Sequence, residues 1–263
     1  MLIGEAIDMK QQLTDLIVQR LNDNASLLKK EFNREHPIKV ARHFALDDLL
    51  PADIAERIYA HFPKPSRMHC ISNPGKIKLK YSHLKDTHRL LQDINAAIQD
   101  PRVVAVIENI TGIPHQIPDT SKHAGGISTL LKGYYINPHL DNSHDVEHKR
   151  YYRTVNLLYY VSPNWQQHNG GHYEVWDEAI ENHILVPNQF NRLVVMETNR
   201  TSWHAVNPVL CKAPRCCVFN YFFSEHSPEG VDYFFDTSSF RARPEQTIRR
   251  AIARVKNVFF KKK

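Results

Sequence analysis

Short β-rich runs follow one another after Gly125-Gly126, and they limit the possible fold more than any other feature of the chain. Turn-forming residues such as Asn169-Gly170-Gly171 and Asn207-Pro208 separate them. The runs cover 127–136, 153–161, 171–177, 183–187, 192–197, 203–206 and 215–224. Many short strands with turns between them predict a sandwich or barrel. A jelly roll, also called a double-stranded β-helix, fits this pattern.

The first half of the chain differs, because its apolar residues recur at helical spacing. The segments with this spacing are 8–35, 52–62, 85–99 and 103–110. Helices first and strands later predict an α+β chain, in which a helical shell covers a β-core. We expect an N-terminal helical extension (1–38), one domain at 39–226 with its jelly-roll core at about 127–224, and a C-terminal segment (227–263).

The composition, 42% apolar and 24% charged residues, is typical of a globular chain with a core of its own. No apolar run approaches the ~18 residues that a membrane span needs. The stretch Met1-Leu2-Ile3-Gly4-Glu5-Ala6 lacks the basic and apolar regions of a signal peptide. We therefore expect a cytoplasmic protein, with any membrane association made through the basic C-terminal helix.

That C-terminal helix is expected over about 244–260, within a segment that carries most of the surplus positive charge. Residues 241–263 contain nine Lys or Arg residues and one acid, Glu245. Ile248, Ile252, Val255 and Phe259 recur at helical spacing. We expect this apolar stripe to pack on the jelly roll. The alternative is peripheral contact of 245–263 with an anionic membrane. Nucleic acid is the least favoured partner, because no base-stacking motif accompanies the charge.

The chemistry centres on His139-Leu140-Asp141 in the middle of the chain. On an extended strand, residues i and i+2 point to the same face, so this imidazole and carboxylate could hold one cation. His204, at the end of a predicted strand, is the best third ligand. Two histidines and one carboxylate form the facial triad of non-haem iron(II) oxygenases. We therefore treat His139, Asp141 and His204 as candidate catalytic and metal-binding residues.

A candidate anion site follows eleven residues after His204. Arg215 opens the apolar strand Cys216-Cys217-Val218-Phe219-Asn220-Tyr221-Phe222-Phe223. An unpaired cation inside a jelly roll is costly to bury, so Arg215 needs an anionic partner. A ligand carboxylate, held bidentately by the guanidinium, would provide one.

In order and spacing, His139, Asp141, His204 and Arg215 resemble the iron(II)- and 2-oxoglutarate-dependent dioxygenases, in particular the prolyl-4-hydroxylase-like branch. The resemblance runs from about Val40 to Phe223 and is strongest over 127–223. Two further segments carry it. Residues 153–165 resemble an Arg-led strand that ends in two tyrosines and a Trp, and residues 170–176 resemble the family's Gly-Gly strand.

The resemblance implies iron(II) as metal and 2-oxoglutarate as cosubstrate, with ascorbate as a candidate accessory. Arg215 then binds the distal carboxylate of 2-oxoglutarate, and Tyr160 falls where a cosubstrate-binding tyrosine stands in the oxygen-sensing prolyl hydroxylases. A further tyrosine of the family is replaced here by Thr129-Leu130-Leu131, so that contact is either lost or supplied by Tyr134 or Tyr135.

Strand alternation places Asn156 on the same face as Tyr160, so it is a candidate for a hydrogen bond to the cosubstrate or its water. Arg153 has two interpretations, contact with the substrate or a structural salt bridge.

The implied reaction uses O2 and 2-oxoglutarate to hydroxylate a substrate carbon, and it releases succinate and CO2. Related halogenases lack the acid of the triad, so Asp141 favours hydroxylation. The prime substrate is unidentified: a prolyl or other protein side chain is one option, and a sugar or glycolipid head group is the other. A non-catalytic jelly-roll protein that binds a metal or carboxylate is the alternative from another class.

Overall fold

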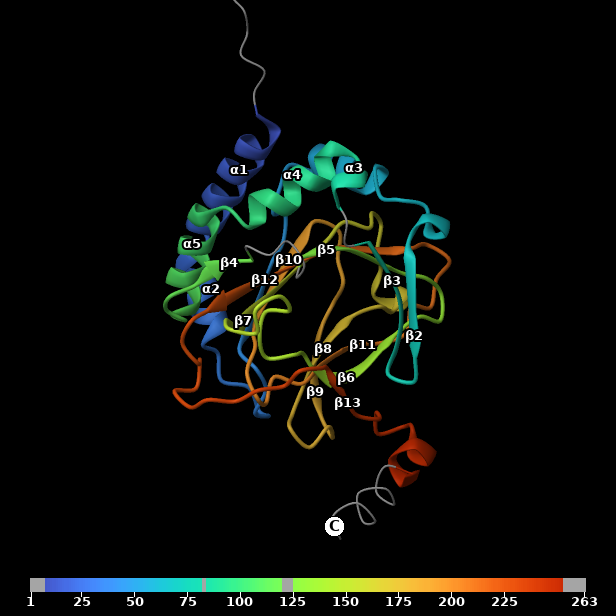
Figure 1. Ribbon diagram of the computed structural model, residues 1–263. Helices are drawn as coiled ribbons and strands as arrows, with labels where there is room; N and C mark the ends of the chain where they lie inside the picture. The colour runs from blue at the N-terminus through green and yellow to red at the C-terminus, as the bar shows by residue number, and fades with distance from the viewer. Residues whose placement is uncertain (1–7, 82–83, 120–124, 253–263) are drawn as a thin grey trace, which may run out of the picture.

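The computed structural model describes residues 8–81, 84–119 and 125–252. A layer of helices covers one flank of a barrel of strands (Figure 1). The α-helices are α1 (Met9–Asp23), α2 (Ala25–Phe32), α3 (Ala52–Ala60), α4 (Arg89–Ile98) and α5 (Pro101–Thr111). Local sequence explains the bounds of α5. The Asp100 side chain caps its first turn, Pro101 occupies N1, and Gly112 ends it at φ 68°.

The strands confirm the predicted α+β jelly roll. They are β1 (His43–Leu46), β2 (His69–Asn73), β3 (Lys76–Tyr81), β4 (Ile117–Pro118), β5 (Gly126–Leu130), β6 (Ile136–Leu140), β7 (Tyr152–Tyr160), β8 (Tyr173–Trp176), β9 (His183–Val186), β10 (Arg192–Glu197), β11 (His204–Val206), β12 (Arg215–Ser224) and β13 (Ser239–Phe240). The expected single run at 127–136 is two strands, β5 and β6, because the chain turns at Gly133 with φ 83°.

The strands form two antiparallel layers that one strand joins. One layer has the order β1-β10-β7-β12-β5-β3, and the other has the order β6-β11-β8-β9. Strand β3 pairs with β5 through Leu79–Tyr81 and with β6 through Lys76 and Ile136. It therefore closes one side of the barrel and forms a wall of its interior. The β2–β3 hairpin lies in a stretch for which the sequence indicated no strands.

A β-bulge in β7 changes which side chains enter the barrel. Phe222 of β12 pairs with Val155, but the next residue, Phe223, pairs with Arg153. Strand β7 therefore holds one extra residue, Thr154, and the alternation shifts there. As a result Arg153 lines the same cavity as Asn156, although simple alternation would put them on opposite faces.

The main hydrophobic core lies between the helices and the outer face of the larger layer. Leu13, Ile17 and Phe32 of the N-terminal helices are buried there with Leu157 and Val195 of the sheet. A second cluster, which includes Tyr160, Tyr173 and Val175, fills part of the barrel interior. The N-terminal helices thus share one core with the sheet, and the division of the chain at 38 and 226 stays a prediction.

The C-terminal segment packs differently from what the sequence suggested. Residues 247–252 are helical, but Ile248 and Ile252 are 76% and 52% exposed. This helix instead contacts the barrel surface through two arginines: Arg249 donates to the carbonyl of Pro74, and Arg250 pairs with Glu181 at 2.8 Å. The expected apolar packing is therefore wrong for the two isoleucines. Val255 and Phe259 lie outside the described residues. In the described part of the chain, every helix is too short or too polar to cross a membrane.

Candidate metal and cosubstrate site

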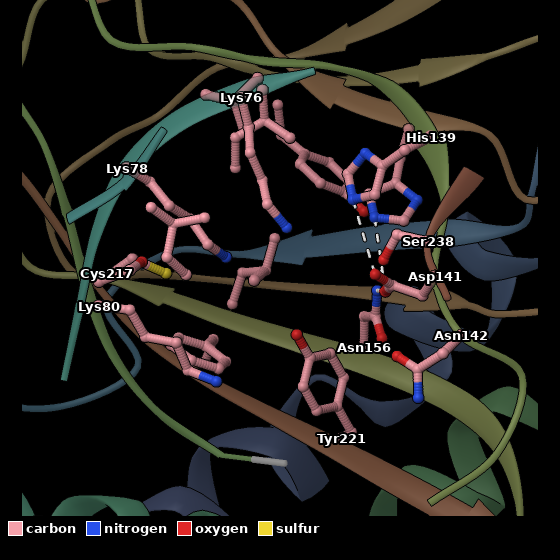
Figure 2. A pocket seen from close by; sticks show the side chains of 18 of the residues that line it. Lys76, Lys78, Lys80, His139, Asp141, Asn142, Asn156, Cys217, Tyr221 and Ser238 are labelled. Atoms are coloured by element: carbon pink, nitrogen blue, oxygen red, sulfur yellow. Dashed lines mark hydrogen bonds and ion pairs between the residues drawn. The ribbon is translucent and has the colours of Figure 1, made fainter. Parts of the chain in front are cut away.

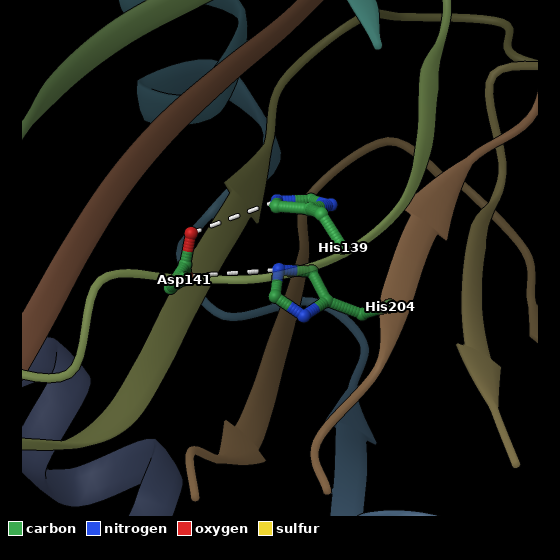
Figure 3. A group of neighbouring side chains, drawn as sticks. All are labelled: His139, Asp141 and His204. Carbon is green, nitrogen blue, oxygen red and sulfur yellow. Dashed lines mark ion pairs between the residues drawn. The ribbon is translucent and has the colours of Figure 1, made fainter. Parts of the chain in front are cut away.

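Two neighbouring strands bring the two histidines together. His139 of β6 pairs directly with His204 of β11 in antiparallel register, and the ring centroids lie 4.1 Å apart. One antiparallel residue pair of the sheet therefore brings together two histidines that lie 65 residues apart in the sequence. Asp141 follows β6 immediately and turns its carboxylate toward both rings (Figure 3).

Backbone carbonyls fix the protonation pattern of both imidazoles. Nδ1 of His139 lies 3.0 Å from the carbonyl of Asn137, and Nδ1 of His204 lies 2.9 Å from the carbonyl of Ser202. A carbonyl only accepts, so each Nδ1 carries the proton and each Nε2 presents a lone pair. Outer hydrogen bonds of this kind orient metal-binding histidines.

The carboxylate completes a compact donor set. Its two oxygens lie 3.6 Å from Nε2 of His139 and 3.6 Å from Nε2 of His204. One donor atom from each of the three residues lies within 4.8 Å of the others. This is a one-sided set of two nitrogens and one oxygen, the type that suits iron(II) and leaves coordination positions open.

Arg153 and Asn156 hold the carboxylate in place. Nη1 of Arg153 lies 3.1 Å from Oδ2 of Asp141, and Nδ2 of Asn156 donates to the same oxygen at 2.9 Å. Burial alone would raise the pKa of Asp141, but Arg153 and the two histidines hold it well below its usual range. Burial, together with the nearby His139, lowers the pKa of His204 to about 4. At neutral pH the site is thus one anion and a neutral imidazole at His204.

The donor set opens into a cavity of about 210 Å³ inside the barrel. Arg215, at the start of β12, lines the same cavity and is 2% exposed. Its Nε donates to the carbonyl of Gly171 at 2.6 Å. A Cβ at Gly171 would stand 2.8 Å from Cδ of Arg215, so this glycine leaves room for the arginine. The structure thus brings His139, Asp141, His204 and Arg215 into one cavity.

Three buried polar atoms at or beside this cavity lack a hydrogen-bond partner in the described structure: Oδ1 of Asn156, Nε of Arg153 and the hydroxyl of Tyr160, which lies beside Arg215 but is not part of the cavity lining. The Arg215 guanidinium lies 4.6 Å from the centroid of the Tyr160 ring. Burial raises the pKa of the Tyr160 hydroxyl, so it stays a hydrogen-bond donor. Unsatisfied buried groups are rare and often mark a ligand site. A ligand carboxylate beside Arg215 fits this donor pattern.

Tyr134 does not join this group. It is absent from the residues that line the cavity, and its side chain lies near Cys70, which together with burial raises its pKa. Its side chain also packs against the interior cluster that contains Tyr160, so its role in cosubstrate binding stays a prediction. Tyr135 does not line the cavity either.

Several cavity residues were not expected from the sequence. Tyr173 of β8 and Tyr221 of β12 line it, and Arg153 stacks on Tyr221 with its Cζ 3.8 Å from the ring centroid. Three lysines of β3 also point into it: Lys76, Lys78 and Lys80. Their alternation, Lys-x-Lys-x-Lys, was the available signal, since period two places residues of a strand on one face.

Comparison with known proteins agrees with this geometry. Residues 125–223 match the family described as the 2OG-Fe(II) oxygenase superfamily. No curated protein matches the chain. Among solved structures, a prolyl 4-hydroxylase of Phytophthora capsici has a TM-score of 0.55 at 12% identity, covering 89% of this chain and 72% of its own. A Pseudomonas putida prolyl-4-hydroxylase has a TM-score of 0.51 at 15% identity, with 79% and 98% covered.

The structural likeness at these identities establishes the fold, and the family match establishes the chemistry. The family match confirms the predicted superfamily, with iron(II) and 2-oxoglutarate as its cofactor and cosubstrate. Residues 125–223 therefore belong to the 2OG-Fe(II) oxygenase superfamily, and the chain is an iron(II)- and 2-oxoglutarate-dependent dioxygenase with the fold of the prolyl 4-hydroxylases.

Proposed function

We propose that His139, Asp141 and His204 are the iron(II) ligands of a hydroxylase. The observation that carries this proposal is the donor set itself, with donor atoms from all three residues within 4.8 Å of one another. Both Nε2 atoms are free to bind because both Nδ1 atoms donate to backbone carbonyls. Asp141 is ionised through its contact with Arg153.

We assign the distal carboxylate of 2-oxoglutarate to Arg215, with the Tyr160 hydroxyl as a second donor. Arg215 uses Nε on the carbonyl of Gly171, which fixes the plane of its guanidinium and leaves the terminal nitrogens for a carboxylate. The Tyr160 hydroxyl has no partner among the described residues, which supports this role. Asn156 orients Asp141 through Nδ2, and its unpaired Oδ1 is available to a cosubstrate or water.

The proposed overall reaction converts R–H, O2 and 2-oxoglutarate into R–OH, succinate and CO2. Iron(II) supplies the activation of O2 that this reaction requires, and the oxidation of 2-oxoglutarate supplies two electrons. The chain's own residues orient the reactants. Leu158 and Val206 give the cavity an apolar lining beside the donor set, which limits the entry of water.

Two substrate classes remain proposals. A prolyl or other protein side chain agrees with the fold shared with prolyl 4-hydroxylases, and a sugar or glycolipid head group is the other class. Peripheral contact with an anionic membrane is a separate proposal. The exposed Ile248 and Ile252 beside Arg249 support it, and co-sedimentation with phosphatidylglycerol vesicles, with Ile248→Ser/Ile252→Ser as the variant, tests it.

Succinate formation tests the proposed activity without knowledge of the substrate. The assay contains 2-oxoglutarate, O2, iron(II) and ascorbate, and it compares the wild type with Asp141→Ala and with Asp23→Ala, an exposed acid on α1. We expect iron-dependent succinate from the wild type and Asp23→Ala only. Absence of both succinate and iron-dependent 2-oxoglutarate binding in the wild type would contradict the proposal and favour the non-catalytic metal- or carboxylate-binding alternative.

A further inference from the structure

A row of three lysines forms one wall of the cavity. Lys76, Lys78 and Lys80 alternate along β3, so their side chains project to the same side of the strand. Figure 2 shows the three ammonium groups directed toward the space in front of His139 and Asp141. The row is half-buried, because β3 closes the barrel between β5 and β6.

Each of these ammonium groups lies over an aromatic ring. Nζ of Lys78 and Nζ of Lys80 lie 5.5 Å and 5.4 Å from the centroid of Phe219, and Nζ of Lys76 lies 5.2 Å from that of Phe240. Within 8–81, 84–119 and 125–252, none of the three forms an ion pair with a carboxylate. Burying an unpaired cation costs free energy unless an anion binds beside it.

The whole cavity has a surplus of positive charge. Its lining holds five cationic side chains, the three lysines with Arg153 and Arg215, against one carboxylate, Asp141. Arg153 is already paired with Asp141. Burial, followed by the mutual repulsion of the row, lowers the pKa of Lys78 to about 7, and burial also lowers the pKa values of Lys76 and Lys80. A bound anion would relieve this repulsion.

The cosubstrate does not account for the row. In the proposed function, one carboxylate of 2-oxoglutarate goes to Arg215 and the other goes to the metal with the keto oxygen. Its two charges and the charge of iron(II) cancel, so the three lysines remain without a counter-charge in the loaded site. Each lysine of the row feels the charge of Asp141, and the row also feels its own mutual repulsion and the charge of Arg153. The row therefore lies beside the donor set on the β3 wall.

We propose that the row Lys76, Lys78 and Lys80 binds an anionic group (phosphate, sulfate or carboxylate) of the prime substrate and so places a neighbouring carbon at the metal. This inference rests on the proposed function, since it assigns the substrate class of that same site. The cavity volume of about 210 Å³ is below the roughly 300–1,000 Å³ of typical ligand pockets, so an anionic group that binds there beside 2-oxoglutarate has to be compact.

Calorimetric titration with sulfate tests the proposal. Sulfate is a dianion at all working pH values and a weak ligand of Mn(II), which replaces iron(II) without turnover. The protein is first loaded with Mn(II) and saturated with 2-oxoglutarate, and sulfate is then titrated at constant ionic strength. The variant is Lys76→Met/Lys78→Met/Lys80→Met, because Met keeps the apolar stem and removes the charge. Lys132→Met, at an exposed turn lysine, is the matched control.

We expect sulfate to bind the loaded wild type and the Lys132→Met control equally. In the triple variant its Kd should be weaker by about tenfold or more, because charge-assisted hydrogen bonds are lost. Thermal unfolding verifies that the variant is folded. Equal sulfate affinity in wild type and triple variant overturns the proposal. So does competition between sulfate and 2-oxoglutarate together with weaker 2-oxoglutarate binding in the triple variant, since the row would then serve the cosubstrate.

The loading step keeps the two proposals apart. If 2-oxoglutarate does not bind the Mn(II)-loaded protein, or binds Arg215→Met equally well, the proposed function fails whatever sulfate does. If it binds and sulfate does not, only the anion proposal fails. A last arm replaces sulfate with phosphatidylglycerol vesicles. Vesicle binding that sulfate displaces and the triple variant loses assigns the anion to a lipid head group, and sulfate binding alone assigns it to a soluble compound.

Discussion

Arg153 and Asp141 form a buried ion pair, with Nη1 3.1 Å from Oδ2, next to the two histidines of the donor set. The arginine is held from behind by Tyr221, whose ring centroid lies 3.8 Å from its Cζ, and by Asn142, which accepts from Nη2 at 2.9 Å. The pair therefore ionises and orients the carboxylate before any metal arrives. Of the two interpretations left by the sequence, the structural salt bridge is present.

Replacing this arginine tests its effect on metal binding. In Arg153→Gln the pKa of Asp141 should rise, because its nearest positive charge is gone, while burial still favours the neutral acid. Metal affinity should fall by roughly 10–100-fold, the usual effect of losing an outer partner of a ligand. The loss should be larger at pH 5.5 than at pH 7.5. Mn(II) titration measures it, with Arg42→Gln, which breaks a partly exposed pair with Glu197, as control. Unchanged affinity would contradict this role.

Tyr160 and Tyr159 form a natural pair of test and control. The Tyr160 hydroxyl lacks a partner among the described residues, whereas the Tyr159 hydroxyl donates to Asn191 at 2.8 Å on the opposite face of β7. Tyr160→Phe should raise the Kd for 2-oxoglutarate about tenfold without loss of stability, since it removes one hydrogen bond to a carboxylate. Tyr159→Phe should lower the unfolding free energy by about 1 kcal/mol and leave 2-oxoglutarate binding unchanged. The reverse pattern would remove Tyr160 from the cosubstrate site.

The sequence alone was enough to predict that His139, Asp141 and His204 lie together, because the pattern that relates them is local or follows the order of the strands. Alternation on one strand relates His139 to Asp141, and the position of His204 at a strand end indicates a neighbouring strand. The face on which Arg153 lies could not be predicted in this way. It depends on the extra residue Thr154, and a bulge has no clear signature in a run of β-forming residues.

Long-range packing explains the other differences. Tyr134 satisfies the sequence argument equally well as a cosubstrate ligand, but the turn before β6 directs it toward Cys70. The β2–β3 hairpin was missed although residues 76–81, Lys-Ile-Lys-Leu-Lys-Tyr, alternate polar and apolar side chains as a half-buried strand does. Its lysines are tolerated there because they face the cavity and not the core.

Phe240 tests how the C-terminal segment contributes to the site. Its ring stacks on His139, with centroids 5.0 Å apart and planes 13° from parallel, because β13 pairs with β6 at this point. In Phe240→Ala the imidazole loses this support, and Mn(II) affinity should fall about tenfold, as for other outer contacts of metal ligands. Phe234→Ala, at a 53% exposed position, is the control and should not change the affinity. Equal affinities in both variants would show that the segment only covers the site.

Lys78 gives a pH signature that is independent of metal and activity. Its pKa of about 7 in the folded protein lies below the value of about 10.4 in the unfolded chain. Between these values the unfolded state binds more protons, so the wild type becomes more stable as pH rises through this window. Lys78→Met lacks the group that takes up this proton on unfolding, so it should be more stable than the wild type at pH 7. The difference in stability should shrink toward pH 10. Urea unfolding at pH 7, 8.5 and 10 measures this, with Lys132→Met as control. A difference that stays constant with pH would show that Lys78 has an ordinary pKa, and that burial of its charge does not destabilise the folded protein.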